Sequence, residues 1–203
     1  MPLFFFNAKW SFLFQKMNDH KDNIFFMAKV SFEFDRYDDV IIQMKKYIEI
    51  DSKLTETQMD ILSKSYYEIV CSYRETIKKI NESHDKTYKL EQYKQFYIEK
   101  LNSYCRDFIS LIEKKLKNQE NCMPVTILLL KYEADYSRYL IEYQPKSQQC
   151  FQYEKISNLY QNALDLCSQL ECYDELLLKV ALNYSVFLHD VVGKIKEGFD
   201  MLR

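Results

Sequence analysis

Glycine and proline limit what this chain can fold into, because only two glycines and three prolines occur in its 203 residues. Average usage of the two residue types together is about 12%. Hairpins and the loops between strands and helices depend on them for their turn conformations. Apolar residues make up 47% of the sequence, which is enough to build a core. The sequence therefore predicts an all-α protein that is ordered over most of its length.

The same scarcity argues against several classes of enzyme. Gly193 and Gly198 have the separation found in a phosphate-binding loop, but Phe199 stands where that motif needs a lysine. The three histidines have no helical zinc or di-iron spacing around them, and they lie at positions 20, 84 and 189. We therefore expect no catalytic residue of these classes, no metal site and no cofactor.

The six cysteines are not arranged as a zinc knuckle or a redox motif, since no two of them are closer than five residues; they lie at positions 71, 105, 122, 150, 167 and 172. In a helical chain of this length, we interpret them as small buried hydrophobes in a reducing compartment rather than as a disulfide framework. This interpretation predicts a cytoplasmic protein.

The charge balance and the N-terminus bear on possible partners. Lysine and arginine total 28 against 30 acidic residues, and no basic stripe alternates with aromatics, so we expect no nucleic-acid partner. The aromatic-rich segment 1–21 is too short to span a bilayer, and it lacks the basic start and the cleavage site of a signal peptide. We expect it to be an extension that packs on a domain over 22–203, with no membrane partner.

Apolar residues recur at helical spacing from about Phe25 onward, in segments separated by polar or proline-bearing joints. Thr55 and Gln58 form a capping box where one segment should begin. Short connections favour antiparallel neighbours, and no repeat of the kind found in regular solenoids occurs. We expect eight helices, over 22–34, 37–50, 56–83, 88–117, 124–143, 149–170 and 174–192 and from about 195.

The segment KYEADYSRYLIEY places charged residues on one face of the helix expected at 124–143. Lys131, Asp135 and Arg138 step by four and three, and Tyr139 lies close to the same face. Two basic groups and a phenol therefore converge on this face.

The helix expected at 56–83 carries Tyr67 and Arg74 along one line, because they are seven residues apart. If the two helices are neighbours, Arg74 and Arg138 can face each other across a cleft. Two guanidiniums in a partly dry cleft need an anion, and a phosphate accepts paired hydrogen bonds from both. The alternative is that these arginines are solvated or bridge to Asp135 and Glu142.

A third feature is the segment LLLKVALNYSVFLHDVV, which is apolar almost all round. It is therefore either fully buried or offers a second apolar face to a ligand. Leu178, Leu182 and Val186 step by four along it, with Asn183 beside them. Asn183 is either a residue that grips an extended peptide backbone or an ordinary asparagine bonded within the core.

Four stretches of the chain, in order and at similar intervals, resemble the 14-3-3 proteins: RYDDVIIQMKKY (36–47), CRDFISLIEKKL (105–116), DYSRYLIEY (135–143) and ALNYSVFLHDV (181–191). The resemblance extends from about Phe25 to the end of the chain. It implies an all-α antiparallel array with a ninth helix that is absent from this sequence. It also implies a homodimer, no catalysis, and a groove in each protomer that binds phosphoserine or phosphothreonine peptides.

The resemblance also implies roles for individual residues. Arg74, Arg138 and Tyr139 match the phosphate-binding triad of the family. Lys131 matches a lysine of the groove, and Asn183 matches the asparagine that holds the peptide main chain. The apolar wall of the groove corresponds to Leu178, Leu182 and Val186.

The chain departs from the family at the groove and at the expected dimer interface. Tyr67 stands where the family has a lysine that contacts phosphate, so affinity for phosphate is expected to be lower. Arg36 matches an interface arginine whose partner glutamate is replaced here by Lys100, and the partner of Asp39 would be Phe96. We expect the apolar part of the interface to decide whether a dimer forms.

The sequence leaves three functions open. The leading hypothesis is an adaptor that recognises phosphorylated client proteins. The second is a helical scaffold that binds unmodified peptides or partner proteins through the apolar groove. The third, an enzyme, rests only on Ser185, His189 and Asp190, which have no oxyanion site beside them.

Overall fold

The computed structural model describes residues 20–84, 87–116, 122–170 and 175–201. Eight α-helical segments and no strand occur in these ranges, so the expected all-α fold is confirmed. The chain divides into two compact units, Met1–Ser65 and Tyr66–Arg203. The expected extension over 1–21 lies almost wholly outside the described residues. None of the helices in the described ranges is long and apolar enough to cross a membrane.

The first unit contains the helical residues 20–33, α2 (Tyr37–Ile50) and the beginning of α3 (Glu56–Glu82). Contacts between successive segments hold it together. Lys21 Nζ lies 2.5 Å from Asp51 Oδ2, just after α2 ends. Gln58 Nε2 at the start of α3 donates to Tyr47 Oη on α2 at 2.8 Å. The buried face of α2 consists of Val40, Ile41, Met44, Tyr47 and Ile48.

The capping box expected at the start of α3 is confirmed. The Thr55 backbone N–H donates to Gln58 Oε1 at 2.9 Å, and the Gln58 N–H donates to Thr55 Oγ1 at 3.3 Å. Two backbone donors that have no partner inside the helix are satisfied in this way. The polar pair therefore fixes the residue at which α3 begins.

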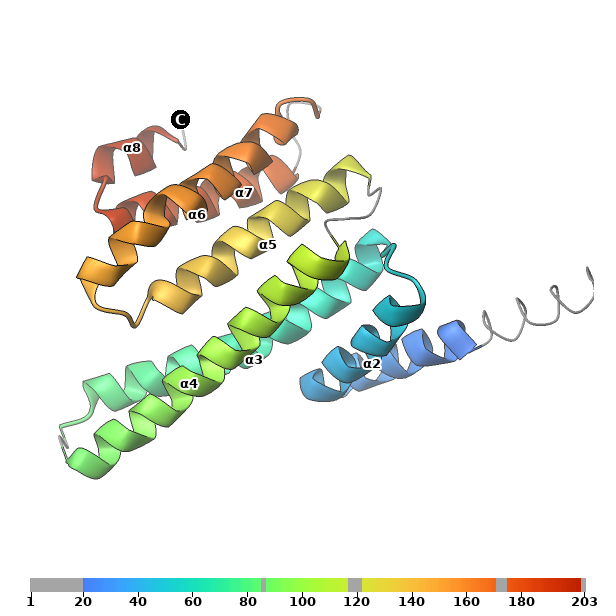
Figure 1. The fold of residues 1–203 in the computed structure, drawn as a ribbon, viewed down its shortest axis with the longest axis horizontal. Coiled ribbons are helices and arrows are strands. Elements are labelled where there is room, and N and C mark those ends of the chain that lie inside the picture. Colours follow the sequence, from blue (N-terminus) through green and yellow to red (C-terminus); the bar gives the residue numbers. More distant parts are fainter. Residues whose placement is uncertain (1–19, 85–86, 117–121, 171–174, 202–203) are drawn as a thin grey trace, which may run out of the picture. The chain divides into compact units, whose positions relative to one another are not determined.

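The second unit contains the rest of α3, followed by α4 (Tyr88–Leu111), α5 (Met123–Ile141), α6 (Lys146–Cys167), α7 (Glu175–Val186) and α8 (Ile195–Asp200). Helices that follow one another in sequence also pack together, α4 with α5, α5 with α6 and α6 with α7. Figure 1 shows α4, α5 and α6 side by side. The helices of this unit are thus arranged as a layered array of successive neighbours.

Aromatic side chains fill much of the second unit. The ring of Tyr66 on α3 stacks on that of Phe108 on α4 at 4.4 Å between centroids. Tyr136 on α5 meets Phe108 edge to face at 4.7 Å. On the other side of α5, Tyr160 of α6 stacks on Tyr184 of α7 at 5.2 Å. These four buried tyrosines therefore serve helix packing, which positions α3, α5 and α7 around a common set of polar groups.

Two helices end differently from the expectation. The helices expected to run to 117 and 192 change to π-helical winding at Ile112–Leu116 and Phe187–Val192. Gly193 then ends the second segment with φ at 82°, a left-handed conformation that glycine adopts without steric cost. The N–H groups of Gly193 and Lys194 both donate to the carbonyl of Leu188. These hydrogen bonds satisfy a carbonyl at the end of the helix, and the chain then changes direction and enters α8.

The interpretation of the cysteines is only partly correct. Cys105 and Cys167 are buried, and burial raises the pKa of the Cys105 thiol to about 12. Cys122 and Cys150 are exposed, so they are not core residues. Cys122 precedes α5 directly and Cys150 lies in the first turns of α6, where side chains face solvent. The five cysteines within the described residues are free thiols.

Candidate functional site

Two arginines from different helices meet at one aromatic ring. The guanidinium carbon of Arg74 on α3 lies 4.7 Å from the centroid of the Tyr139 ring, and that of Arg138 on α5 lies 4.6 Å from it. The sequence placed these arginines on two separate helix faces, and the packing of α3 and α5 brings them together. The π-electrons of the ring attract each cation, which offsets part of their mutual repulsion.

Arg74 has a carboxylate partner within the chain. Its Nε donates to Glu142 Oε2 at 2.8 Å, and its Nη2 donates to Glu142 Oε1 at 3.1 Å. Both side chains are about one third exposed. Burial opposes the charge of Arg74, but the hydrogen bond and charge of Glu142 outweigh it, so the pKa of Arg74 lies above its usual value. The bridge to Glu142 that the sequence left open as an alternative is therefore present.

Arg138 is held differently. Its side chain is only 12% exposed, and its Nη2 lies 3.9 Å from Asp135 Oδ1, too far for a hydrogen bond. Its Nε is buried and has no hydrogen-bond partner among the described residues. Burial lowers the pKa of Arg138, whereas Tyr160, Tyr139 and Asp135 together raise it above the usual value. Arg138 is thus a charged, nearly buried group with donor capacity to spare.

Asp135 collects the other polar groups of the site. It accepts hydrogen bonds from Lys131 at 2.7 Å and from the Tyr160 hydroxyl at 2.5 Å. The Asn183 amide donates to both of its oxygens, at 2.9 and 2.8 Å. One buried carboxylate therefore joins α5, α6 and α7. Because its oxygens already have three donors, it is poorly placed to hold Arg138 as well.

Tyr139 is protonated at neutral pH and can donate a hydrogen bond. Burial and the charge of Asp135 raise the pKa of its phenol, and the two arginines lower it by a smaller amount. A protonated phenol beside two guanidiniums adds a neutral donor to a cationic site. The three groups together suit a ligand that accepts hydrogen bonds and carries negative charge.

The residues expected to form a groove have two different environments. On α7, Leu178 and Leu182 are 67% and 53% exposed and lie one helical turn apart, and Val186 is partly buried. Asn183, beside them, is partly buried and turns its amide donor toward Asp135. The carbonyl oxygen is therefore the end that Asn183 can offer to a ligand.

Lys131 and Tyr67 are both engaged within the chain. Lys131 is nearly buried and ion-paired with Asp135, so it neutralises that carboxylate. Tyr67 on α3 is 48% exposed, and a hydrogen bond with Cys71 raises the pKa of its phenol. Tyr67 thus offers the site a hydroxyl where a cationic side chain would offer charge.

A pocket of about 520 Å³ lies beside the ion pair of Arg74 and Glu142. Three carboxylates, two cationic groups and a tyrosine line it, so its walls carry mixed charge; the lining residues are Cys71, Arg74, Glu75, Lys78, Asn81, Glu82, Glu142 and Tyr143. Burial raises the pKa of Tyr143 to about 12, so this phenol is also protonated at neutral pH. The pocket gives the Glu142 side chain open space on one side.

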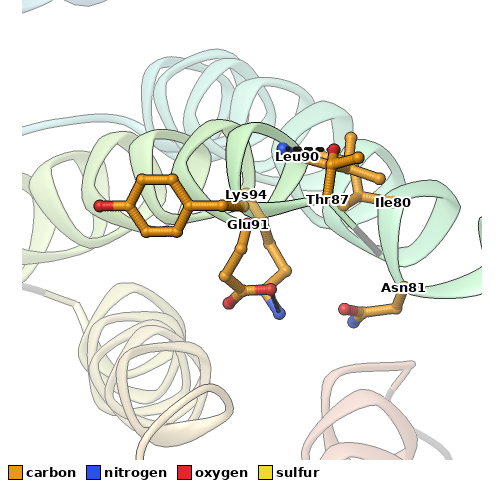
Figure 2. Close-up of a pocket in the computed structure, with 7 residues that line it drawn as sticks. Ile80, Asn81, Thr87, Leu90, Glu91 and Lys94 are labelled. Atoms are coloured by element: carbon orange, nitrogen blue, oxygen red, sulfur yellow. Dashed lines mark hydrogen bonds and ion pairs between the residues drawn. The ribbon is translucent and has the colours of Figure 1, made fainter. Parts of the chain in front are cut away.

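A smaller pocket, of about 200 Å³, lies between the end of α3 and the start of α4. Figure 2 shows the side chains that line it. The Thr87 side chain accepts the Leu90 N–H there at 3.4 Å, which caps α4. Lys94 and Glu91 form an ion pair at 2.7 Å on the same wall. Thr87, Glu91 and Lys94 are thus engaged in a helix cap and a local ion pair, which is typical of a helix junction.

The four residues expected at a dimer interface pair within the chain. Arg36 Nε donates to Asp39 Oδ2 at 3.1 Å; the Arg36 side chain is 70% exposed and that of Asp39 is 45% exposed. In the other unit, the Lys100 ammonium lies 5.5 Å from the centroid of the half-exposed Phe96 ring. Each charge therefore has a local partner, and no residue of another chain is required to satisfy it.

The residues on which an enzyme hypothesis rested are not arranged as a nucleophile and base. The Ser185 hydroxyl is buried and donates to the Gly198 carbonyl at 2.8 Å, which joins α7 to α8. The His189 ring nitrogen Nδ1 lies 2.5 Å from Asp190 on the exposed side of the same segment. Ser185 therefore has a packing role.

Sequence reasoning found the face that carries Lys131, Asp135, Arg138 and Tyr139, but it missed the role of Tyr160. Tyr160 lies on α6, 25 residues from the carboxylate that it contacts. No spacing rule within one helix connects two residues on different helices. Only the packing of α5 against α6 shows the connection.

Comparisons with known proteins identify relatives of the chain. A family model described as "14-3-3 protein" matches residues 27–203. The chain is 29% identical over 185 residues to 14-3-3-like protein 2 of Caenorhabditis elegans, covering 87% of this chain and 75% of the relative. It is 27% identical over 199 residues to 14-3-3-like protein GF14 iota of Arabidopsis thaliana, covering 89% and 74%. It is 24% identical over 198 residues to the 14-3-3 protein of Giardia intestinalis, covering 90% and 78%.

Proposed function

The chain belongs to the 14-3-3 family, and from that premise we propose that it is an adaptor that binds phosphoserine or phosphothreonine segments of client proteins. Arg74, Arg138 and Tyr139 hold the phosphate in this proposal. The protein performs no catalysis, acts in the cytoplasm and works as a homodimer. Its partners are phosphorylated proteins rather than nucleic acids or membranes.

The observation that carries the proposal is the convergence of two guanidiniums on the Tyr139 ring. A phosphate monoester carries about −1.5 to −2 charges near neutral pH and three strong acceptor oxygens. Arg138 is charged and has no carboxylate within hydrogen-bond distance in the described part of the chain, and Tyr139 has a protonated hydroxyl. A phosphate accepts hydrogen bonds from these groups. Its negative charge also balances the positive charge of the arginines, which a neutral ligand does not.

The side chains of α7 support the peptide part of the proposal. Leu178 and Leu182 expose two apolar groups one turn apart, which can cover an apolar residue next to the phosphorylated one. Asn183 follows Leu182 in the sequence and donates to Asp135, so its carbonyl end is the one that can accept a peptide N–H. These features together favour an extended peptide ligand that carries one anionic residue.

A binding titration tests the proposal. We expect a phosphoserine peptide of a natural client to bind, and its unmodified twin to bind at least tenfold more weakly, because the charge-assisted hydrogen bonds to phosphate are lost. The Arg74→Ala and Arg138→Ala variants should each reduce this difference. Equal affinity for the two peptides would contradict the proposal.

A second candidate function is a scaffold for unmodified peptides. The Arg74–Glu142 ion pair and the exposed leucines of α7 favour it, because the charge of Arg74 is already balanced while the apolar face is uncovered. In that case Leu182→Ala would weaken partner binding and Arg74→Ala would not. Phosphatase treatment of the partner distinguishes the two functions, since it abolishes binding only for the adaptor.

A further inference from the structure

The Arg74–Glu142 ion pair uses one complete edge of the guanidinium. Glu142 takes the Nε and Nη2 donors through its two oxygens, at 2.8 and 3.1 Å. This fork is the same edge-on geometry in which arginine binds a phosphate. Glu142 therefore binds the same donors of Arg74 that an anionic ligand would bind.

Glu142 is also free to leave this contact. It is the residue directly after α5, where its own N–H donates to the Tyr139 carbonyl, so the backbone is fixed while the side chain projects from the helix end. The side chain is one third exposed and borders the pocket of about 520 Å³. Lys78 lines the same pocket, and its ion pair with Glu82 is loose at 3.9 Å. A Glu142 carboxylate that rotates away from Arg74 thus enters a solvated space with a cation in it.

The other arginine has no such competitor. The nearest carboxylate to Arg138 is Asp135 at 3.9 Å, and Asp135 already accepts hydrogen bonds from Lys131, Tyr160 and Asn183. Those donors come from three helices and are largely buried, so Asp135 is fixed in place. Of the two arginines, only Arg74 is blocked by an acid that can move.

We propose that Glu142 is an internal competitor for Arg74, which it holds in the free protein and releases when a phosphorylated ligand arrives. This inference rests on the proposed function and adds a regulatory residue to it. Every ligand that contacts Arg74 must first break the ion pair with Glu142, and this cost weakens its binding. A phosphate gives Arg74 a more highly charged acceptor in exchange, whereas an unmodified serine leaves the pair intact.

The test compares Glu142→Gln with Glu75→Gln, titrated with a phosphoserine peptide and its unmodified twin. Glu75 lines the same pocket, so its replacement removes an equal charge without removing a hydrogen bond to Arg74. We expect Glu142→Gln to bind the phosphopeptide about fivefold more tightly than the parent protein, which is the upper range for a partly exposed ion pair. Glu75→Gln should change it less than twofold, and neither variant should change binding of the unmodified twin.

The outcomes are distinguishable. If the parent protein binds the phosphopeptide and Glu142→Gln binds it equally or more weakly, Glu142 positions Arg74 and the competitor inference is wrong. If neither protein distinguishes the two peptides, the proposed function itself fails. A second variant, Glu142→Ala, removes the hydrogen bonds together with the charge and must also bind the phosphopeptide more tightly than the parent protein.

The ¹H–¹⁵N signal of Arg74 Nε gives an independent readout. It should shift on addition of phosphopeptide if the partner of Arg74 changes from Glu142 to phosphate, and it should stay in place if the pair persists.

Discussion

Position 138 requires the shape of a guanidinium as well as a positive charge. The Arg138 guanidinium carbon lies 4.6 Å from the centroid of the Tyr139 ring, and no carboxylate is within hydrogen-bond distance of the group in the described residues. We predict that Arg138→Lys weakens phosphopeptide binding by about tenfold, because an ammonium is a point charge that cannot offer a planar pair of donors. Isothermal titration calorimetry measures this effect, with circular dichroism to establish equal folding. Unchanged affinity would show that charge alone suffices.

Tyr160 anchors the buried carboxylate that organises the site. Its hydroxyl donates to Asp135 at 2.5 Å, and the Tyr160 side chain is fully buried. We predict that Tyr160→Phe lowers the free energy of unfolding by about 1.5 to 3 kcal/mol, the range for a hydrogen bond to a charged group. Urea denaturation measures the loss. The exposed pair Tyr93 and Tyr97, at 2.9 Å, gives a control, since Tyr93→Phe should cost less than about 0.5 kcal/mol.

The candidate site could be predicted from the sequence only as far as single-helix geometry allows. Lys131 and Asp135 are four residues apart, and the ion pair between them follows directly from that spacing. The choice of partner for Arg74 did not follow, because a phosphate, solvent and Glu142 are all chemically acceptable to a guanidinium. Only the approach of α3 to the end of α5 selects Glu142 in the free protein.

At the scale of the element, the ion pair of Lys21 and Asp51 connects the helical residues 20–33 to the end of α2. The hydrogen bond from Lys21 lowers the pKa of Asp51 below its usual value of 3.8, although burial acts in the opposite direction. A carboxyl whose pKa is lowered by folding stabilises the protein above its unfolded-state pKa, and this contribution is lost as pH falls through the folded-state pKa.

We therefore predict that Asp51→Asn lowers the free energy of unfolding by about 1 kcal/mol or less at neutral pH, because the pair is partly exposed. The difference from the parent protein should shrink below pH 4 and vanish when Asp51 is protonated in both states. Chemical denaturation at a series of pH values measures it. A difference that stays constant down to pH 2 would show that charge is not its origin.

Most helices could be located from apolar spacing and polar joints, because those patterns depend on local chemistry. The Thr55 and Gln58 capping box predicted the start of one helix, and the end expected at 192 agrees with the structure, in which Gly193 follows the last helical residue. The change to π-helical winding at Phe187–Val192 could not be foreseen, because its sequence, FLHDVV, has no feature that distinguishes it from an α-helix. Similarly, the exposure of Cys122 and Cys150 depends on which other helices pack against the starts of α5 and α6. Amino-acid composition does not predict that packing.

At the scale of the whole molecule, the charges of the expected dimer interface bear on self-association. The family resemblance implies that Arg36 and Lys100, which carry the same charge, approach one another in a dimer. Within one chain, Arg36 donates to Asp39 and Lys100 lies near the Phe96 ring. We predict a weak dimer in sedimentation velocity at high micromolar concentration. Lys100→Glu should tighten it several-fold by replacing a repulsion with an attraction. Monomers only, for both proteins, would contradict the homodimer.

The uncovered leucines of α7 have a thermodynamic consequence for any extended ligand that lies across them. Water next to Leu178 and Leu182 has a higher heat capacity than bulk water, and it is released when those side chains are covered. Association should therefore become more exothermic as temperature rises, and the slope should be smaller for a ligand that contacts only the cationic groups. That slope reports how far along α7 a bound client extends.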